Sequence, residues 1–115
     1  MLSPIYGDGL QQRDWLHVSD HCRAIESVRT KGRIGEVYHI GAEETTRSNL
    51  EIAQMIADIL GKPHTLLEHV TDRLGHDWRY SLDTTKIKTE LGWVPQIDFR
   101  IGLEETISWF EGKGY

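Results

Sequence analysis

The sequence has little cysteine, no long apolar run and an excess of acidic over basic residues. A single cysteine among its 115 residues, Cys22, excludes an internal disulfide framework and a zinc knuckle built from cysteines. No apolar run approaches the roughly 20 residues that cross a bilayer. The N-terminal segment lacks the basic and apolar stretches of a secretory signal. Thirteen basic and 18 acidic residues give a net charge of −5, which argues against a nucleic-acid-binding surface. These features predict a reduced, cytoplasmic protein with no membrane or nucleic-acid partner.

Two motifs of cofactor-dependent oxidoreductases are also absent. A dinucleotide site needs Gly-x-Gly-x-x-Gly between a strand and a helix. The one Gly-x-Gly in a turn-like context, Gly7-Asp8-Gly9, has Gln12 at the third position after it and leads into a predicted strand. A Tyr-x-x-x-Lys proton-transfer pair is missing, because no lysine follows four residues after Tyr6, Tyr38 or Tyr80. The glycine pair is therefore interpreted as a tight turn, and no catalytic residue is assigned.

The apolar residues that are present alternate between strand-like and helix-like spacing. Strands are predicted at residues 4–6, 14–18, 36–40 and 65–70. Helices are predicted from residue 19 to 31, from 49 to 60, from 83 to 91 and from 103 to 112. The expected fold class is α/β, a small mixed sheet with covering helices, formed by residues 1–115 as a single domain.

Residues with capping side chains or glycine predict where the helices begin and end. Ser19 or Asp20 is the expected N-cap of the first helix, and Gly32 is expected to supply a left-handed C-cap. Either Ser48 or Asn49 caps the second helix. Residues spaced three apart on the first helix predict its buried face: Cys22, Ile25 and Val28.

His17 and His21 have the spacing of a helical zinc pair. The two histidines fall on a predicted strand and at a predicted helix start, and no glutamate lies between them. No metal site is therefore expected.

Anion binding is the other chemistry that the side chains suggest. Arg13 follows the glycine turn, and Arg73, His76 and Arg79 crowd into one loop. Arginine suits bidentate contact with phosphate, and nearby aromatic rings stack on a base. The competing interpretation is that neighbouring aspartates simply pair with these arginines: Asp14, Asp72 and Asp77.

The loop Arg73-x-Gly75-His76-Asp77-x-Arg79-Tyr80 closely resembles the C-terminal part of dTDP-glucose 4,6-dehydratases, which are extended short-chain dehydrogenase/reductase enzymes. The resemblance extends, in the same order, over Pro4-Ile5-Tyr6-Gly7-Asp8-Gly9, Arg13-Asp14-Trp15-Leu16, Gly35-Glu36-Val37-Tyr38 and Glu90-Leu91-Gly92-Trp93-x-Pro95. Related nucleotide-sugar epimerases usually place Asp directly after the glycine of this loop. Here His76 precedes Asp77, which favours the dehydratase.

This resemblance implies a nucleotide-sugar (substrate) binding domain, with the NAD-binding Rossmann domain of the family absent from residues 1–115. The full family enzyme converts dTDP-glucose to dTDP-4-keto-6-deoxyglucose with tightly bound NAD, in deoxysugar (rhamnose-type) biosynthesis. The chain alone is expected to be an inactive fragment that binds no NAD. Its expected partners are dTDP-glucose, the Rossmann domain and, through an exposed apolar surface, a second copy of itself.

The resemblance also implies the residues of the site. Pro4 and Tyr6 would lie beside the thymine. Four polar side chains would line the nucleotide and diphosphate: Arg13, Asn49, Arg73 and His76. The surrounding loop departs from the family pattern at Leu74, where proline is usual. A stand-alone binding or interaction module and the matching part of an epimerase remain the alternatives.

Overall fold

The computed structural model describes residues 1–42 and 46–114. Its helices are α1 (Val18–Lys31), α2 (Asn49–Ile59), α3 (Thr85–Leu91) and α4 (Phe99–Gly112), with a short 3₁₀ turn at His64–Leu66. Its strands are β1 (Ser3–Tyr6), β2 (Gln12–Asp14), β3 (Thr46–Ser48) and β4 (Leu67–Val70). In the described ranges, no helix is long and apolar enough to cross a membrane.

The strands form two separate pairs. β1 pairs in parallel with β4, with Ser3 opposite Leu67 and Tyr6 opposite Val70. β2 pairs with β3 in the antiparallel sense. A parallel pair needs a crossover, and α2 lies in the connection that leads from β1 to β4. The mixed α/β class is thus confirmed, with its strands in two ribbons.

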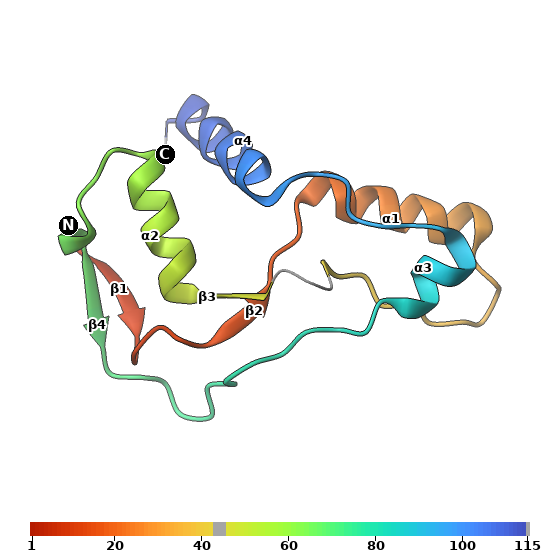
Figure 1. Cartoon of the computed structure of the whole chain (residues 1–115), viewed down its shortest axis with the longest axis horizontal. Coiled ribbons are helices and arrows are strands. Elements are labelled where there is room, and N and C mark those ends of the chain that lie inside the picture. Colours follow the sequence, from red (N-terminus) through yellow and green to blue (C-terminus); the bar gives the residue numbers. More distant parts are fainter. Residues whose placement is uncertain (43–45, 115) are drawn as a thin grey trace.

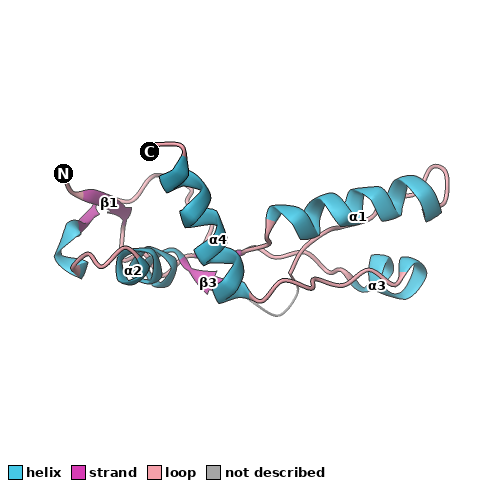
Figure 2. Ribbon diagram, turned by 90° about the horizontal axis from the view of Figure 1, so that it is seen from above, coloured by secondary structure: helices cyan, strands magenta, loops and turns pink. Residues whose placement is uncertain are grey.

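The molecule is elongated, with principal extents of 48 × 35 × 20 Å (Figure 1). Its radius of gyration is 16.6 Å, against about 13 Å for a compact domain of this length. β1, β4, α2 and α4 lie toward one end, and α1 packs beside α3 at the other (Figures 1 and 2).

Each end has its own buried apolar residues. At the α1–α3 end, Ala24, Ile87 and Trp93 form the core. Partly buried side chains pack around that core: Leu16, Val28, Tyr38, Ile40 and Leu91. At the other end, Ile5 of β1 is buried, as are Ile52 and Ala57 of α2.

The predicted strand at 14–18 is displaced and shortened, because β2 ends at Asp14. Both carboxylate oxygens of Asp14 accept from the Ala42 N–H, at 3.0 and 2.9 Å. His17 then caps α1, since its Nδ1 accepts from the Ser19 N–H at 3.1 Å. The predicted caps, Ser19 and Asp20, therefore lie inside the helix.

The predicted face of α1 is correct only at Val28, which packs on the core. Cys22 is exposed and Ile25 is 52% exposed, whereas Asp20 and Ala24, four residues apart, face inward. The helix ends at Lys31 as expected, but Gly32 has φ −65°, which is not left-handed. A Cβ on Gly32 would lie 2.4 Å from the Val28 carbonyl oxygen, so glycine is needed for close approach.

Residues 36–40 do not form the predicted strand. Tyr38 and Ile40 do pack on the core, and Val37 is exposed, so the predicted alternation of faces holds. A strand also needs a neighbour to complete its hydrogen bonds, and the described part of the chain pairs none with this segment.

The remaining predicted elements are present, some with shifted boundaries. Ser48 is the N-cap of α2, and its Oγ accepts from the Glu51 N–H at 3.1 Å. The Glu51 carboxylate pairs with Arg47 instead of completing a capping box. β4 begins at Leu67, slightly later than predicted, because the 3₁₀ turn precedes it. The last helix ends at Gly112 as expected, but it begins at Phe99 and not at residue 103, because Asp98 caps it by accepting from the Ile101 N–H at 3.1 Å.

Candidate functional site

The glycine turn after β1 starts the candidate site. The Gly7 N–H donates to the Val70 carbonyl at 2.9 Å, and the Gly9 N–H donates to the Tyr6 carbonyl at 3.1 Å. Both glycines have positive φ, 59° and 72°, a conformation that other residues adopt at a cost. The turn leads into β2, and not into a helix as a dinucleotide-binding turn would. These residues therefore do not fit an NAD cradle.

The loop of residues 71–80 runs back beside this turn. The Gln12 N–H donates to the Trp78 carbonyl at 2.8 Å, and Gln12 forms an isolated parallel bridge with Arg79. The Arg13 guanidinium then lies over the Tyr80 ring, with Cζ 4.5 Å from its centroid. The loop and β2 thus present Arg13 next to residues that are far away in the sequence.

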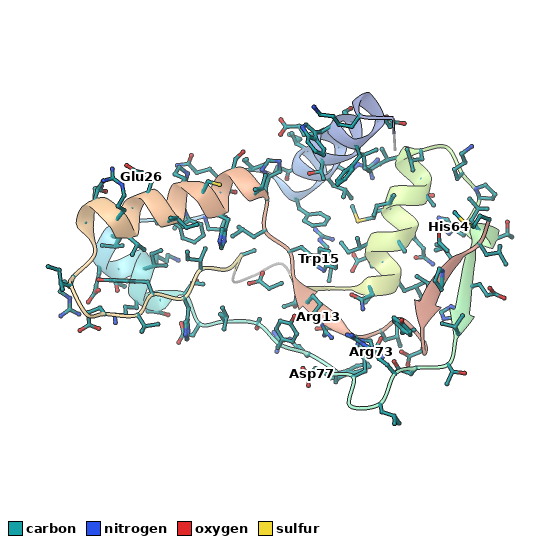
Figure 3. The ribbon with its side chains drawn as sticks, turned by 180° about the vertical axis from the view of Figure 1, so that it is seen from behind. Arg13, Trp15, Glu26, His64, Arg73 and Asp77 are labelled. Carbon is teal, nitrogen blue, oxygen red and sulfur yellow. The ribbon has the colours of Figure 1, made fainter. Side chains whose placement is uncertain are left out.

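Tyr6, Arg73 and His76 meet at the start of the same loop. The Tyr6 and His76 rings are in edge contact, with centroids 6.2 Å apart. The Arg73 Cζ lies 5.7 Å from the Tyr6 ring centroid. Figure 3 shows Arg13 near the middle of the molecule and Arg73 below it, both away from Glu26 on α1. Arg73 and His76 thus lie around Tyr6 of β1, and Arg13 extends from β2 over Tyr80, at the end of the same loop.

Asp72 and Gln11, which the sequence patterns do not assign to the site, hold this arrangement together. Asp72 Oδ1 lies 2.6 Å from His76 Nδ1, and Oδ2 accepts from Gln11 Nε2 at 3.1 Å. In the competing interpretation, these aspartates pair with arginine side chains. Asp72 and Asp14 instead bind other groups. Asp14 binds the Ala42 N–H, and an Arg13 nitrogen donates to the Gln12 carbonyl. No sequence pattern marks these contacts, because Gln11 and Asp72 are 61 positions apart.

Pro4 and Asn49 border this group. Pro4 is exposed on β1 and shares a strand face with Tyr6, because side chains two apart point the same way. Asn49 opens α2, and its N–H donates to the Gln11 carbonyl at 3.0 Å. Since Ser48 provides the cap, the Asn49 side chain is not needed for capping.

The metal hypothesis finds no support in residues 1–42 and 46–114, where no group of three histidine, cysteine or acidic side chains could hold an ion. His17 has both ring nitrogens engaged: Nδ1 caps α1, and Nε2 lies 3.4 Å from Glu105. His21 lies in the first turn of α1.

Carboxyl groups with a lowered pKa lie away from this site. Glu36 is hydrogen-bonded to Lys86, which lowers its pKa, and the positive charge of Arg33 lowers it further. Glu90 contacts Tyr38 and Arg33, and these contacts lower its pKa despite some desolvation. These pairs connect the segment after α1 to α3.

A cavity of about 340 Å³ lies between α2 and α4. Its walls are mainly apolar and include Trp15, Ile52, Ile56, Phe99 and Leu103. None of the six predicted site residues is among its described walls. The arginine–histidine group is therefore separate from this cavity.

Comparison with known proteins places the chain among nucleotide-sugar enzymes. The family model described as GDP-mannose 4,6 dehydratase matches residues 2–106. A dTDP-glucose 4,6-dehydratase from Streptomyces niveus is 56% identical over 107 residues, covering 93% of this chain and 32% of the relative. One from an Actinoplanes species is 52% identical over 111 residues, covering 96% and 34%. The chain thus spans about a third of the length of these relatives.

Two solved structures are similar throughout the chain. A dTDP-glucose 4,6-dehydratase from Bacillus anthracis, solved with NAD, has a TM-score of 0.88 at 49% identity and covers 96% of this chain and 35% of its own. A UDP-glucose 4-epimerase from Thermotoga maritima, solved with UDP-glucose, has a TM-score of 0.88 at 29% identity, covering 99% and 36%.

Proposed function

We propose, from the premise that the chain belongs to the GDP-mannose 4,6 dehydratase family, that residues 1–115 form the nucleotide-sugar-binding part of a dTDP-glucose 4,6-dehydratase. The activity of that enzyme is conversion of dTDP-glucose to dTDP-4-keto-6-deoxyglucose in deoxysugar biosynthesis. The identity of 56% to a dehydratase of this specificity supports the assignment. The order of His76 and Asp77 in the loop after β4 supports it too.

The observation that supports the proposal is that Arg73 and His76 both lie against the Tyr6 ring, while Arg13 lies over Tyr80 at the end of the same loop. Their partners are mostly aromatic rings: Tyr80 lies under Arg13, and Tyr6 lies beside Arg73 and His76. Guanidinium groups over rings retain N–H donors for an anion. A diphosphate offers the charge that such donors bind most strongly.

Each site residue then has a role toward the nucleotide. Arg13, Arg73 and His76 bind the diphosphate, and Asn49 contributes from the start of α2. The exposed face of β1, with Pro4 and Tyr6, lies against the base. We assign no NAD contact to these residues, since the glycine turn leads into a strand. In the family enzyme, NAD supplies the hydride acceptor that side chains cannot replace.

The test is a titration of the 115-residue chain with dTDP, followed by amide NMR shifts. Because only part of a binding pocket is formed, we expect affinity in the millimolar range, about −4 kcal/mol. Shifts should concentrate on residues 4–13 and 71–80. Glucose alone should produce none, since the sugar carries no charge for the arginines. Equal responses to glucose and dTDP would contradict the proposal.

Single substitutions refine this test. Arg13→Ala and Arg73→Ala should each weaken dTDP binding about ten-fold, the usual effect of losing one charge-assisted contact. Arg29→Ala is the matched control, because Arg29 pairs with Glu26 on α1, far from the site. Equal losses in all three variants would indicate non-specific attraction of an anion.

Part of a nucleotide-sugar epimerase is the second candidate, favoured by the likeness to the Thermotoga maritima epimerase. The two candidates differ in the expected base. Competition between dTDP and UDP on the same chain distinguishes them: a dehydratase part should prefer dTDP. Preference for UDP would favour the epimerase, and binding of neither nucleotide would leave an interaction module.

A further inference from the structure

The loop after β4 contains a carboxylate, Asp72, that has contacts both within the loop and with the segment around the β1 turn. Asp72 Oδ1 accepts from the Arg73 N–H at 2.9 Å and contacts His76 Nδ1 at 2.6 Å. Oδ2 accepts from Gln11 Nε2 at 3.1 Å. The side chain also fills the space above Gly7, where a Cβ would lie 2.9 Å from Oδ2. Asp72 thus joins the β1 turn to the start of the loop.

The contact with Asp72 has a chemical consequence for His76. A carboxylate accepts hydrogen bonds, so Nδ1 of the imidazole must carry the hydrogen. In the neutral ring, Nε2 then has no hydrogen and is an acceptor; in the charged ring, it is a donor. The His76 side chain is only 3% exposed and lies against the Tyr6 ring, so its orientation is held on two sides.

Gln11 holds Asp72 from the opposite direction. Its side chain is almost wholly buried, and its amide nitrogen donates to Asp72. The Gln11 carbonyl accepts from the N–H of Asn49 at the start of α2. Among the described residues, the Gln11 Oε1 has no hydrogen-bond partner. Asp72 is thus the hydrogen-bond partner that satisfies the amide nitrogen of this buried side chain.

We propose that Asp72, held by Gln11, is a positioning residue that fixes the tautomer and orientation of His76 in the candidate nucleotide site. The identity of the ligand that His76 binds rests on the proposed function. Asp72 acts through His76 and does not itself touch the phosphates.

The first measurement needs no ligand. Long-range proton–nitrogen NMR spectra distinguish the two tautomers of each of the six histidines. We expect the neutral His76 ring to carry its hydrogen on Nδ1. Asp72→Asn should change His76 to a mixture of tautomers or to the other tautomer. Gln11→Ala should shift the tautomer population of His76 in the same direction but by less. Unaltered His76 ring shifts in Asp72→Asn would overturn the proposal.

The chain provides a matched control pair. His64 contacts Asp58 through Nε2 at 2.7 Å, so its neutral ring should show the opposite tautomer. Asp58→Asn should change the His64 signals and leave both the His76 signals and dTDP binding unchanged. Circular dichroism establishes that each variant is folded.

The second measurement separates positioning from direct contact. Asp72→Asn should weaken dTDP binding about five-fold, the loss expected from one misplaced hydrogen bond. In a His76→Gln background the same change should have no further effect. An equal loss with and without His76 would overturn the proposal, because Asp72 would then act on the ligand directly. If the unaltered chain binds no dTDP, the proposed function fails, and the tautomer measurement still decides whether Asp72 positions His76.

Discussion

Asp20 connects three parts of the α1–α3 end through one buried carboxylate. Its two oxygens accept from the N–H groups of Gln96 and Ile97, each at 3.0 Å, and from Arg23 at 2.9 Å. Its carbonyl accepts from the Trp93 indole at 3.2 Å. Burial raises the pKa of Asp20, but these donors outweigh that effect and leave the pKa below its usual value. The carboxylate therefore stabilises the fold only while it is ionised.

We expect Asp20→Asn to lower the free energy of unfolding by about 2 kcal/mol near neutral pH, because charged hydrogen bonds are lost. A lowered folded-state pKa means that this contribution is present above the unfolded value of about 3.9. It is lost as pH falls through the folded-state pKa. Urea unfolding of both proteins across this range should show their difference shrinking below about pH 4. Glu26→Gln, on an exposed pair, is the control and should change stability little.

Gly9 combines a left-handed backbone with a crowded position. A Cβ there would lie 2.6 Å from Ile5 Cγ2 and 2.9 Å from Leu50 Cβ. Gly61 has a similar φ, 66° against 72°, but nothing within 4 Å of a Cβ. We expect Gly61→Ala to cost about 1 kcal/mol from backbone strain alone. Gly9→Ala should cost about 1–3 kcal/mol more from overpacking. Equal urea-unfolding midpoints for Gly9→Ala and Gly61→Ala would contradict this, because the residues around Gly9 would then accommodate the extra carbon.

Among the helices, α2 has the clearest local start signal and the most direct connection to the candidate site. Ser48 is the last residue of β3 and the N-cap of α2, so the helix begins directly after the strand. The Leu50 N–H donates to the Gly9 carbonyl at 2.8 Å, which fixes the helix start to the glycine turn. The beginning of α2 therefore supports the turn that presents Tyr6.

We expect Ser48→Ala to lower the free energy of unfolding by about 1 kcal/mol, the usual effect of removing an N-cap hydroxyl. Ser108→Ala is the control, because Ser108 is an exposed serine inside α4, where alanine is the better helix former. Thermal unfolding of the three proteins measures the difference. A loss as large at Ser108 as at Ser48 would contradict the capping role.

For the whole molecule, the elongated shape leaves much apolar surface exposed. At the N-terminal end, Leu2 and Tyr6 are each 50% exposed, and Leu10 is 45% exposed. Ile5, between these residues on β1, is buried and does not contribute to this surface. Among the described residues β1 pairs with β4 alone, so its other edge is open as well. Apolar surface and an open strand edge both favour association with another chain.

We expect the chain to self-associate at millimolar concentration through this N-terminal surface. Light scattering over a concentration series should detect the association, and Leu2→Lys with Leu10→Lys should reduce it. Ile34→Lys is the control, because Ile34 is fully exposed in the turn after α1. A monomer at every concentration, or equal effects of all three lysines, would contradict the expectation.

The chain by itself should form no 4-keto-6-deoxy sugar from dTDP-glucose, even with NAD added. No Tyr-x-x-x-Lys pair occurs in the sequence, and the glycine turn enters a strand. The hydride acceptor must come from a bound cofactor. Turnover in proportion to the amount of verified 115-residue chain would overturn this prediction.

The sequence by itself determined the features that depend on neighbours along the chain. Apolar spacing and an N-cap located α2, the glycine turn ended β1, and the Arg73–Tyr80 loop is irregular as predicted. The long motifs of this loop also indicated the family, because they combine several uncommon residues at fixed spacing. These signals are local, because caps, turns and helix faces involve residues only a few positions apart.

The tertiary structure decided what depends on partners far away in the sequence. Residues 36–40 keep the alternation of a strand but lack a paired neighbour among the described residues, so pattern alone overpredicted them. Asp20 looked like a helix cap, yet its carboxylate is buried against residues 96 and 97. Asp72 looked like a partner for arginines, yet it binds Gln11, 61 positions earlier, and contacts His76. A carboxylate takes whichever donors the fold brings to it, and spacing along the chain does not specify them.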